Sequence, residues 1–478
     1  MKILFVASEF APIAKVGGLG DVIAALPKAL AKLRLNVSIV IPRYGFISKE
    51  NLRLIARDIV VPLAKAQEKI ELYEMPVPDS RLRVFLIENK NYLSTGPAPY
   101  LESTAVAEQK AEIERFVFFS KAVFVLISQG ALKADIVHVH DWHAGALVDL
   151  MANGKWQMAR GKPKTIFTIH NLGNQGKWSA DEIDNWFFAE GEEKIFTRFK
   201  NDYNFIAEGI LHADRVTTVS PTYAKEILTS KYGEKLEKVL QKQKKHLTGI
   251  LNGIDYDFWN PETDKFIFKN YSAKDFIGGK AENKRALQIG LGLKEAANLP
   301  LFGLVARLTP QKGIDFATAV LEKFIEKHDS QFIFLGKGKR EYENALIALA
   351  KKFPKNIYAK IGFDEQLAHR IYAASDFFLI PSRFEPSGLG QMISMRYGTL
   401  PVVRATGGLK DSVRHMKTGF VFEKESSSAL RKNFELAHSH YINHRDLIKR
   451  MQDNGFKENF DFIKAAEKYK KLYQVMLS

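Results

Sequence analysis

The chain has 478 residues, of which 46% are hydrophobic and 26% charged; this is the composition of a globular protein, and the length predicts two domains of roughly 200 residues each. It contains no cysteine, which excludes disulfides and thiolate chemistry. The formal charge of +16 permits nucleic acid, a membrane surface or anionic small substrates as partners, but the lysines are spread out rather than gathered into one patch.

Neither a nucleic acid nor a membrane is predicted as a partner. The densest basic stretch, residues 231–245, mixes lysine with glutamate in a helical pattern, which favours a solvated helix face. The longest apolar run, Phe116 to Ile127, is interrupted by Ser120 and Lys121 and is too short to span a bilayer. The chain begins directly with a strand-like segment and shows no signal peptide, so we expect it in the cytoplasm.

The first predicted strand and helix enclose an informative loop. Residues 2–7 form a continuous apolar strand of the kind buried in a parallel sheet, and an amphipathic helix follows from Asp21. Between them lies Lys15-Val-Gly-Gly-Leu-Gly. Glycines at such a turn let backbone N–H groups and the helix dipole face an anion, to which Lys15 adds a full charge. A plain tight turn closed by glycine is the alternative.

Apolar strand-like runs alternate with helical patterns along the rest of the chain. The predicted strands are residues 36–42, 136–140, 165–169 and 215–219 in the first half, and 300–306, 331–335, 356–360, 376–381 and 401–404 in the second. Such alternation predicts an α/β fold, in which a parallel sheet with helices on both faces is built twice. Ligands of these sheets bind beyond the carboxyl ends of the strands.

Two domains and a final helix are predicted. The helical pattern breaks within residues 247–261, so we expect one domain over residues 1–250 and a second over residues 251–455. A last helix over residues 456–478 is expected to pack back on the first domain through one apolar face. That face consists of Phe462, Ala466, Tyr469, Tyr473 and Met476.

The first half allows two further interpretations: a metal site at residues 137–143 and a dinucleotide site after the first strand. Val137-His-Val-His-Asp-Trp-His143 looks like a metal cluster, but no further His or Asp group evidently closes it, so we favour a strand end that faces a sugar or phosphate. A dinucleotide-binding oxidoreductase needs G-x-G-x-x-G after the first strand and an acid ending the second. The loop is Gly-Gly-Leu-Gly and the second strand ends in Ile41-Pro-Arg-Tyr, so this hypothesis fails twice.

Three loops of the second half predict a diphosphate site. Arg307 and Lys312 follow a strand end, where a guanidinium and an ammonium group suit a diphosphate. Glu385 precedes glycines in a strand–loop–helix segment, and residues 401–410 repeat that form. The alternative is a pair of exposed surface cations. Near the domain boundary, Asp255-Tyr-Asp257 resembles an acidic metal–diphosphate motif, but we interpret it as a turn.

Eight motifs follow one another along the chain. They are Lys15-Val-Gly-Gly-Leu-Gly-Asp, His140-Asp-Trp-His, Ile169-His-Asn, Thr217-Thr-Val-Ser-Pro-Thr-Tyr, Leu251-Asn-Gly-Ile-Asp, Arg307-Leu-Thr-Pro-Gln-Lys-Gly, Arg383-Phe-Glu-Pro-Ser-Gly-Leu and Tyr397-Gly-Thr-Leu-Pro-Val-Val-Arg-Ala-Thr-Gly-Gly-Leu. In this order they resemble the motifs of bacterial glycogen synthases and plant starch synthases, and the resemblance runs from Met1 to about Tyr473. The resemblance implies a GT-B fold, with two Rossmann-like doubly wound domains, an acceptor side and a nucleotide-sugar side, and an active site in the cleft between them. It also implies a retaining transfer of glucose to the non-reducing end of an α-1,4-glucan such as glycogen.

The same resemblance assigns the site residues. It implies that Lys15 lies near the donor phosphates and sugar, that Arg307 and Lys312 bind the diphosphate, that Glu385 faces the donor glucose, and that His170 lies beside the anomeric carbon. These five are the expected catalytic residues. Further substrate-binding residues are expected at Gly17, Gly18, Asp21, Tyr100, Asp141, Asn252, Ser387, Gly388, Leu389, Gly390 and Gly408, with Tyr100 near the adenine.

Resemblance to the bacterial members favours ADP-glucose over UDP-glucose as donor and implies neither a cofactor nor a metal. A GT-B transferase with another sugar donor or acceptor is the second hypothesis, because phosphate-binding groups do not report the sugar. A catalytically silent carbohydrate-binding scaffold is disfavoured, because every charged residue named for the site is present. The chain departs from the family pattern at Ser387, Gly390, Gly173 and Asn174, which could alter donor preference or rate.

Glu385 decides the expected mechanism. A double displacement needs a carboxylate nucleophile and an acid/base carboxyl group about 5 Å away. No second acid accompanies Glu385 in its motif; the residue eight positions on, where related retaining transferases carry a glutamate, is Ile393. We therefore expect front-face transfer without a covalent glycosyl-enzyme. The alternative is that Glu385 merely caps the helix that starts near Gly388.

Overall fold

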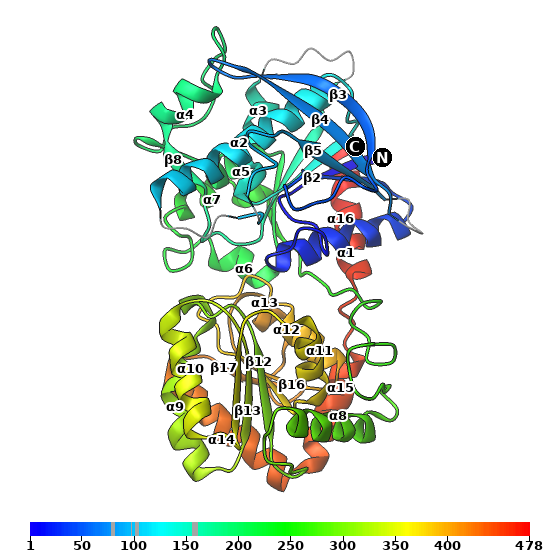
Figure 1. The fold of residues 1–478 in the computed structure, drawn as a ribbon, viewed down its shortest axis with the longest axis vertical. Coiled ribbons are helices and arrows are strands. Elements are labelled where there is room, and N and C mark those ends of the chain that lie inside the picture. Colours follow the sequence, from blue (N-terminus) through cyan, green and yellow to red (C-terminus); the bar gives the residue numbers. More distant parts are fainter. Residues whose placement is uncertain (78–81, 97, 101–104, 155–160) are drawn as a thin grey trace. The chain divides into compact units, whose positions relative to one another are not determined.

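The computed structural model describes residues 1–77, 82–96, 98–100, 105–154 and 161–478, and the chain forms two compact units (Figure 1). Unit 1 comprises Met1–Asn252 together with Phe462–Ser478, and unit 2 comprises Gly253–Asp461. The chain thus passes from the first unit to the second between Asn252 and Gly253, inside the segment 247–261 where the helical sequence pattern breaks.

Unit 1 is built on a nine-stranded sheet of order β11-β10-β7-β6-β1-β2-β5-β4-β3. The strands are β1 (Lys2–Val6), β2 (Asn36–Pro42), β3 (Arg53–Pro62), β4 (Gln67–Met75), β5 (Arg83–Glu88), β6 (Ile136–His140), β7 (Lys164–Ile169), β10 (Arg215–Thr218) and β11 (Leu247–Gly249). All neighbours pair in parallel except β3–β4 and β4–β5, which are antiparallel and form one edge. A separate antiparallel pair consists of β8 (Lys177–Ser179) and β9 (Asp202–Asn204).

Helices cover both faces of this sheet, as the alternating sequence pattern predicted. Those of unit 1 are α1 (Gly18–Lys32), α2 (Val106–Ser128), α3 (Gly145–Asn153), α4 (Ala180–Phe187), α5 (Phe205–His212), α6 (Pro221–Glu226), α7 (Glu237–Lys242) and α16 (Phe462–Leu477), with 3₁₀ turns η1 (Trp142–Ala144) and η2 (Lys244–His246). One apolar core is shared by α1 and α16, and the other by α2, α3 and α5. No helix among the described residues is both long and apolar enough to cross a bilayer.

Unit 2 is a doubly wound, all-parallel sheet of order β14-β13-β12-β15-β16-β17. Its strands are β12 (Leu301–Val305), β13 (Gln331–Gly336), β14 (Ile357–Ile361), β15 (Phe377–Ile380), β16 (Leu400–Arg404) and β17 (Phe420–Phe422). Its helices are α8 (Phe276–Gly290), α9 (Ile314–Lys327), α10 (Arg340–Lys352), α11 (Glu365–Ala374), α12 (Gly390–Arg396), α13 (Gly407–Ser412), α14 (Ser427–Asn443) and α15 (Arg445–Lys457), with a 3₁₀ turn η3 (Pro310–Lys312). One core lies against α9 and α14, the other against α8, α11 and α12.

The predicted last helix is wrong at its start. Helix α15 ends at Lys457 and α16 begins only at Phe462, because the intervening segment binds residues two hundred positions away. The Ile254 N–H donates to the Phe460 carbonyl at 2.8 Å, and the Phe460 N–H donates to the Tyr256 hydroxyl at 2.9 Å. From there on the predicted apolar face of α16 is buried and packs on α1, with Met476 at its margin.

Candidate active site

The glycine loop before α1 already contains an anion supplied by the protein. The N–H groups of Val16 and Gly17 donate to Glu9 Oε2 at 2.8 and 3.0 Å, and Glu9 is 3% exposed. Lys15 Nζ lies 2.7 Å from Asp21 Oδ1 in the first turn of α1, which begins at the exposed Gly18. Two N–H groups of the loop thus bind a carboxylate of the protein itself, which sequence analysis missed, and binding of a substrate anion by this loop stays a prediction.

Tyr100 is joined to the same loop. Its hydroxyl donates to Glu9 Oε1 at 2.7 Å and lies 2.7 Å from the Ser8 hydroxyl, and its ring stacks on His143 with centroids 4.9 Å apart. Burial raises the pKa of the Tyr100 phenol, which therefore stays neutral. Glu9 thus holds the glycine loop and Tyr100 in a fixed arrangement.

We expect Glu9→Ala to lower the free energy of unfolding of unit 1 by about 2–3 kcal/mol, because two N–H groups and one hydroxyl lose a charged acceptor. Glu9→Gln is the control, since its amide oxygen still accepts from both N–H groups. Denaturant titration followed by circular dichroism measures the difference. An alanine variant as stable as the wild type would show that Glu9 does not hold the loop.

Asp141 and His170 meet beyond the ends of β6 and β7. Asp141 Oδ1 accepts from the His170 N–H at 2.7 Å and from the Asn171 N–H at 3.4 Å. Asp141 has φ 55°, in the left-handed region, which is strained for a residue with a side chain. Burial raises the pKa of its carboxyl to about 7 and lowers the pKa of the His170 imidazole to about 3, so His170 is neutral at physiological pH.

Two of the histidines in residues 137–143 form hydrogen bonds to other side chains. His138 Nδ1 lies 2.8 Å from the Tyr473 hydroxyl and its Nε2 2.6 Å from Thr168 Oγ1. His140 Nδ1 lies 2.9 Å from His170 Nε2, so His140 orients the imidazole for which the sequence predicts a catalytic role. Asn252, the remaining predicted residue of unit 1, is buried after β11 and donates its N–H to the Val219 carbonyl at 3.3 Å.

In unit 2 the residues after β12 and β15 converge at the point where the strand order reverses. Lys312 Nζ lies 2.5 Å from Glu385 Oε2, which also accepts from the Ser382 hydroxyl at 2.9 Å. This switch point is where open α/β sheets bind ligands. Helix α12 starts after Leu389 without a capping hydrogen bond from a side chain, so the hypothesis that Glu385 caps it is wrong.

The third predicted loop touches the Glu385 segment directly. The Gly408 N–H donates to the carbonyl oxygens of Glu385 and Pro386 at 3.1 and 3.2 Å. A Cβ atom on Gly407 would lie 2.0 Å from the Glu385 carbonyl oxygen, and one on Gly408 2.1 Å from that of Ser387. Glycine is therefore required at both positions by the close approach of two backbones.

Glycine is required beside α12 for two other reasons. Gly388 has φ +66°, which favours glycine, and a Cβ atom on Gly390 would lie 2.8 Å from the Phe378 ring. The Gln391 amide donates to the Ser387 and Gly388 carbonyls at 3.0 and 3.1 Å and so fixes this turn. Ser387 Oγ itself is buried without a hydrogen-bond partner among the described residues.

Two further features of unit 2 that the sequence singles out are Arg307 and the acidic motif of residues 255–257. The Arg307 side chain is exposed after β12 and forms no ion pair with a described residue, so its guanidinium is available to an anion. The Asp257 N–H donates to Asp255 Oδ1 at 2.9 Å, an Asx turn, as the sequence interpretation predicted.

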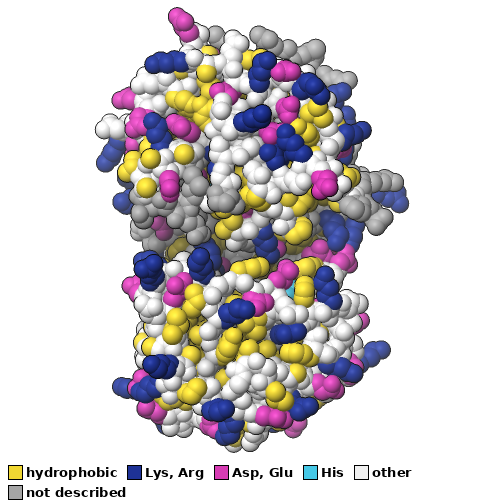
Figure 2. All heavy atoms as spheres, in the orientation of Figure 1, with side chains coloured by type: hydrophobic (Ala, Val, Ile, Leu, Met, Phe, Trp, Pro, Cys, Tyr) yellow, Lys and Arg dark blue, Asp and Glu magenta, His cyan; other side chains and the backbone are white. Residues whose placement is uncertain are grey.

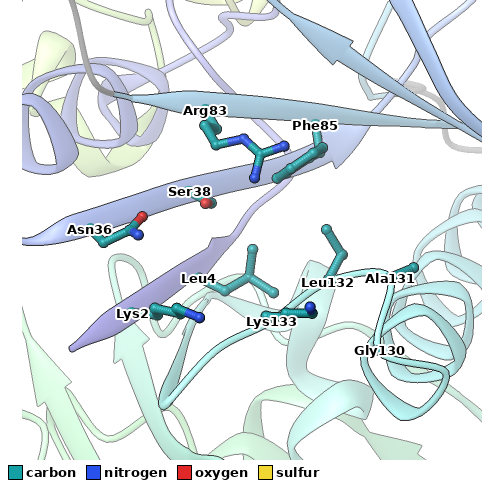
Figure 3. Close-up of a pocket in the computed structure, with 10 residues that line it drawn as sticks. All are labelled: Lys2, Leu4, Asn36, Ser38, Arg83, Phe85, Gly130, Ala131, Leu132 and Lys133. Atoms are coloured by element: carbon teal, nitrogen blue, oxygen red, sulfur yellow. The ribbon is translucent and has the colours of Figure 1, made fainter.

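A pocket of 390 Å³ lies at the amino ends of the parallel strands of unit 1 (Figure 3). It is lined by Lys2, Asn36 and Arg83, the first residues of β1, β2 and β5, and by Lys133. The predicted residues of unit 1 all follow the carboxyl ends of strands, so this pocket is separate from them. On the face drawn in Figure 2, lysines and arginines are interspersed with acidic side chains, in keeping with the spread seen in the sequence.

Two family models match the chain. The model described as starch synthase catalytic domain matches residues 2–242, and that described as glycosyl transferases group 1 matches residues 292–458. Over 493 aligned residues the chain is 40% identical to a glycogen synthase of Thermosipho melanesiensis, covering 100% of this chain and 99% of the relative. The chain belongs to the glycogen and starch synthase family. It is a glycosyltransferase of this family.

Other relatives agree with this assignment. The glycosyltransferase is 38% identical to a glycogen synthase of Bacillus subtilis over 487 residues, covering 99% of this chain and 98% of the relative. Among solved structures it resembles the catalytic domain of starch synthase IV from Arabidopsis thaliana bound to ADP and acarbose, with a TM-score of 0.90, 33% identity and coverage of 99% and 98%. A sucrose-phosphate synthase from Thermosynechococcus elongatus, 17% identical with a TM-score of 0.62, shares the GT-B fold.

Proposed function

We propose that the protein transfers glucose, with retention of configuration, from ADP-glucose to the non-reducing end of an α-1,4-glucan. The observation that carries this proposal is the pairing of Lys312 with the buried Glu385 at the switch point of unit 2, where a nucleotide sugar is expected to bind. The related starch synthase IV was solved with ADP and acarbose, which supports an adenine nucleotide and a glucan as ligands. A cytoplasmic location stays a prediction from the sequence.

In unit 2 we assign diphosphate binding to Arg307, Lys312 and the loops at Ser387–Gly390 and Gly408. As the bond from the anomeric carbon to the diphosphate breaks, negative charge grows on the β-phosphate, and cations fixed there stabilise the transition state. We assign Glu385 to the donor glucose, where its carboxylate orients the sugar and stabilises positive charge at the sugar ring. Lys312 and the Ser382 hydroxyl hold Glu385 Oε2 in place.

In unit 1 we assign Lys15, Gly17, Gly18 and Asp21 to the donor phosphates and sugar. We assign Asp141, His170 and Asn252 to sugar hydroxyls near the reacting carbon, and Tyr100 to the adenine. The neutral His170 imidazole suits this role, because it can donate or accept a hydrogen bond without repelling positive charge at the anomeric carbon.

The proposed reaction needs neither an enzyme nucleophile nor a metal. The bond between the anomeric carbon and the β-phosphate oxygen breaks, and the acceptor 4-hydroxyl oxygen forms the new bond on the same face. The proton of that hydroxyl passes to the departing ADP, whose oxygen lies beside it on that face. Atoms and charges therefore balance within the donor and acceptor.

Incubation with labelled ADP-glucose and a glycogen primer tests the function. Incorporation of label into an elongated primer, released by an α-1,4-specific glucosidase, is the expected result. Hydrolysis of the donor or transfer only to another acceptor would favour a GT-B transferase of different specificity. Binding of ADP-glucose without turnover would favour a carbohydrate-binding scaffold and would contradict the proposal.

We expect kcat/KM to be higher with ADP-glucose than with UDP-glucose, because the chain resembles bacterial members of the family. Initial rates at a fixed, saturating glycogen concentration give both constants side by side. Free ADP and UDP serve as matched competitors that separate recognition of the base from recognition of the sugar. A higher kcat/KM for UDP-glucose would overturn this assignment.

A further inference from the structure

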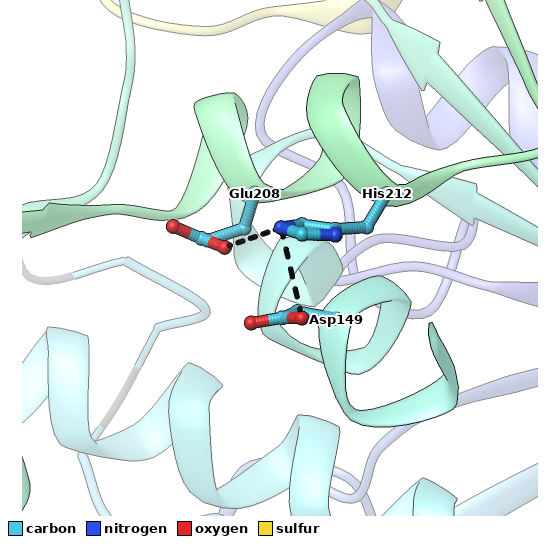
Figure 4. A group of neighbouring side chains, drawn as sticks. All are labelled: Asp149, Glu208 and His212. Atoms are coloured by element: carbon cyan, nitrogen blue, oxygen red, sulfur yellow. Dashed lines mark ion pairs between the residues drawn. The ribbon is translucent and has the colours of Figure 1, made fainter. Parts of the chain in front are cut away.

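A second group of ionisable side chains lies in unit 1, on helices α3 and α5, which pack against each other. It consists of Asp149 from α3 with Glu208 and His212 from α5, and all three side chains point toward one another (Figure 4). None of them is a residue assigned to glucose transfer. The group therefore needs an explanation of its own.

The three side chains have the spacing of metal ligands. His212 Nε2 lies 3.4 Å from Glu208 Oε2 and 3.7 Å from Asp149 Oδ1, and one ligand atom from each residue lies within 4.8 Å of the others. Tetrahedral bonds of about 2.0–2.1 Å to nitrogen and oxygen place neighbouring ligands about 3.3 Å apart. Small side-chain movements would therefore close this triangle on one ion.

Two carboxylate oxygens in the group lack hydrogen-bond donors. Asp149 and Glu208 are 0% exposed, and Asp149 Oδ2 and Glu208 Oε2 have no hydrogen-bond partner among the described residues. Each remaining oxygen has one donor, the Asn153 amide for Asp149 Oδ1 and the Thr197 N–H for Glu208 Oε1. Buried carboxylates without donors are costly unless a proton or a cation neutralises them.

The electrostatics of the group favour a bound cation. His212 is the last residue of α5 and Asn153 the last of α3, so the carbonyl ends of both helices add negative potential.

We propose that Asp149, Glu208 and His212 bind one divalent transition-metal ion of the Zn²⁺ class. One imidazole with two carboxylates suits Zn²⁺ better than Mg²⁺ or Ca²⁺, which prefer oxygen ligands alone. His212 is 23% exposed at its side chain, which gives the ion an entry path from solvent. The ion joins α3 to α5 and is structural, because its ligands come from two helices that pack against each other and none of them is assigned to glucose transfer.

The test uses the full-length protein stripped of metal with a chelator and then dialysed. Titration with Co²⁺ should give the visible absorption of a tetrahedral nitrogen–oxygen site at one ion per chain, and Zn²⁺ should displace it. Zn²⁺ at about a hundred times its dissociation constant should raise the Tm of the first unfolding transition by about 5 °C. The variants Glu208→Gln and Asp149→Asn should lose the spectrum and the Tm shift.

Glu326→Gln, a change of the same type on the exposed face of α9, is the control and should keep both signals. Both test variants remove a buried charge, so we expect them to fold without metal, and circular dichroism checks this. His212→Gln, at the partly exposed member, provides a third variant if either fails to fold. No Co²⁺ spectrum in the wild type, or a spectrum that survives in the folded variants, would overturn the proposal.

Discussion

Replacing Glu385 by glutamine should reduce kcat by about 10³-fold while the fold and ADP binding are retained. Glutamine keeps the size of the side chain and its hydrogen bonds to Lys312 and Ser382, but it removes the charge that stabilises the sugar ring in the transition state. Steady-state kinetics with ADP-glucose and glycogen measure kcat, and calorimetry with ADP measures binding.

Three observations would contradict this mechanism. Near-normal kcat in Glu385→Gln would remove the catalytic role, and a glucosyl-enzyme adduct detected by mass spectrometry would replace front-face transfer by double displacement. Loss of activity in a chelator while circular dichroism shows an intact fold would contradict transfer without a metal. Glu425→Gln, which changes a partly exposed carboxylate near Arg383, is the matched control and should leave kcat unchanged.

Replacing Lys312 by alanine should lower kcat by about 10²-fold, because the ammonium group stabilises the charge that develops on the departing β-phosphate. The Lys312 side chain is 19% exposed and partners a carboxylate that is 8% exposed, so the variant also leaves Glu385 with the Ser382 hydroxyl as its remaining donor among the described residues. Kinetics at several glycogen and ADP-glucose concentrations separate kcat from KM.

The split between the two constants decides the role of Lys312. A rise in KM with unchanged kcat would assign it to uniform binding of the donor, in ground state and transition state alike. Lys323→Ala, at an exposed position on α9, is the control for loss of a cation. A melting temperature measured for both variants shows whether the Glu385 charge destabilises unit 2 once it has lost the ammonium group of Lys312.

Local sequence patterns predicted ten strands of the two parallel sheets, each to within one residue at either end, but they missed the parallel strands β5, β11 and β17. Continuous apolar runs such as those of β1, β12 and β13 make this possible. The antiparallel edge formed by β3 and β4 was not predicted. Strand β3 is largely exposed and does not show a regular alternation of apolar and polar residues, and its pairing with β4 contains two register shifts that no local pattern reveals. The helix break at residues 458–461 depends on contacts with Ile254 and Tyr256, which no local pattern contains.

In the candidate site, too, some features follow from local sequence and others arise only from the fold. Glycines and cations after strand ends identified the loops of both units, and the resemblance added roles for individual side chains. Glu9 was missed because its partners, the glycine-loop N–H groups and Tyr100, come together only in the fold. Ser382, which donates to Glu385, was also missed, and its place just after β15 was the signal that could have identified it.

The contact between Gly407 and the Glu385 carbonyl has a consequence for how mutational data on this enzyme should be interpreted. Any side chain at Gly407 would displace the backbone that carries Glu385. In a saturation scan scored by glycogen formation, Gly407 would therefore rank beside Glu385 although it offers no side chain to a substrate. Loss of function at this glycine would report a steric conflict between two loops, and only the purified protein's residual ADP binding would distinguish it from the loss of a reacting group.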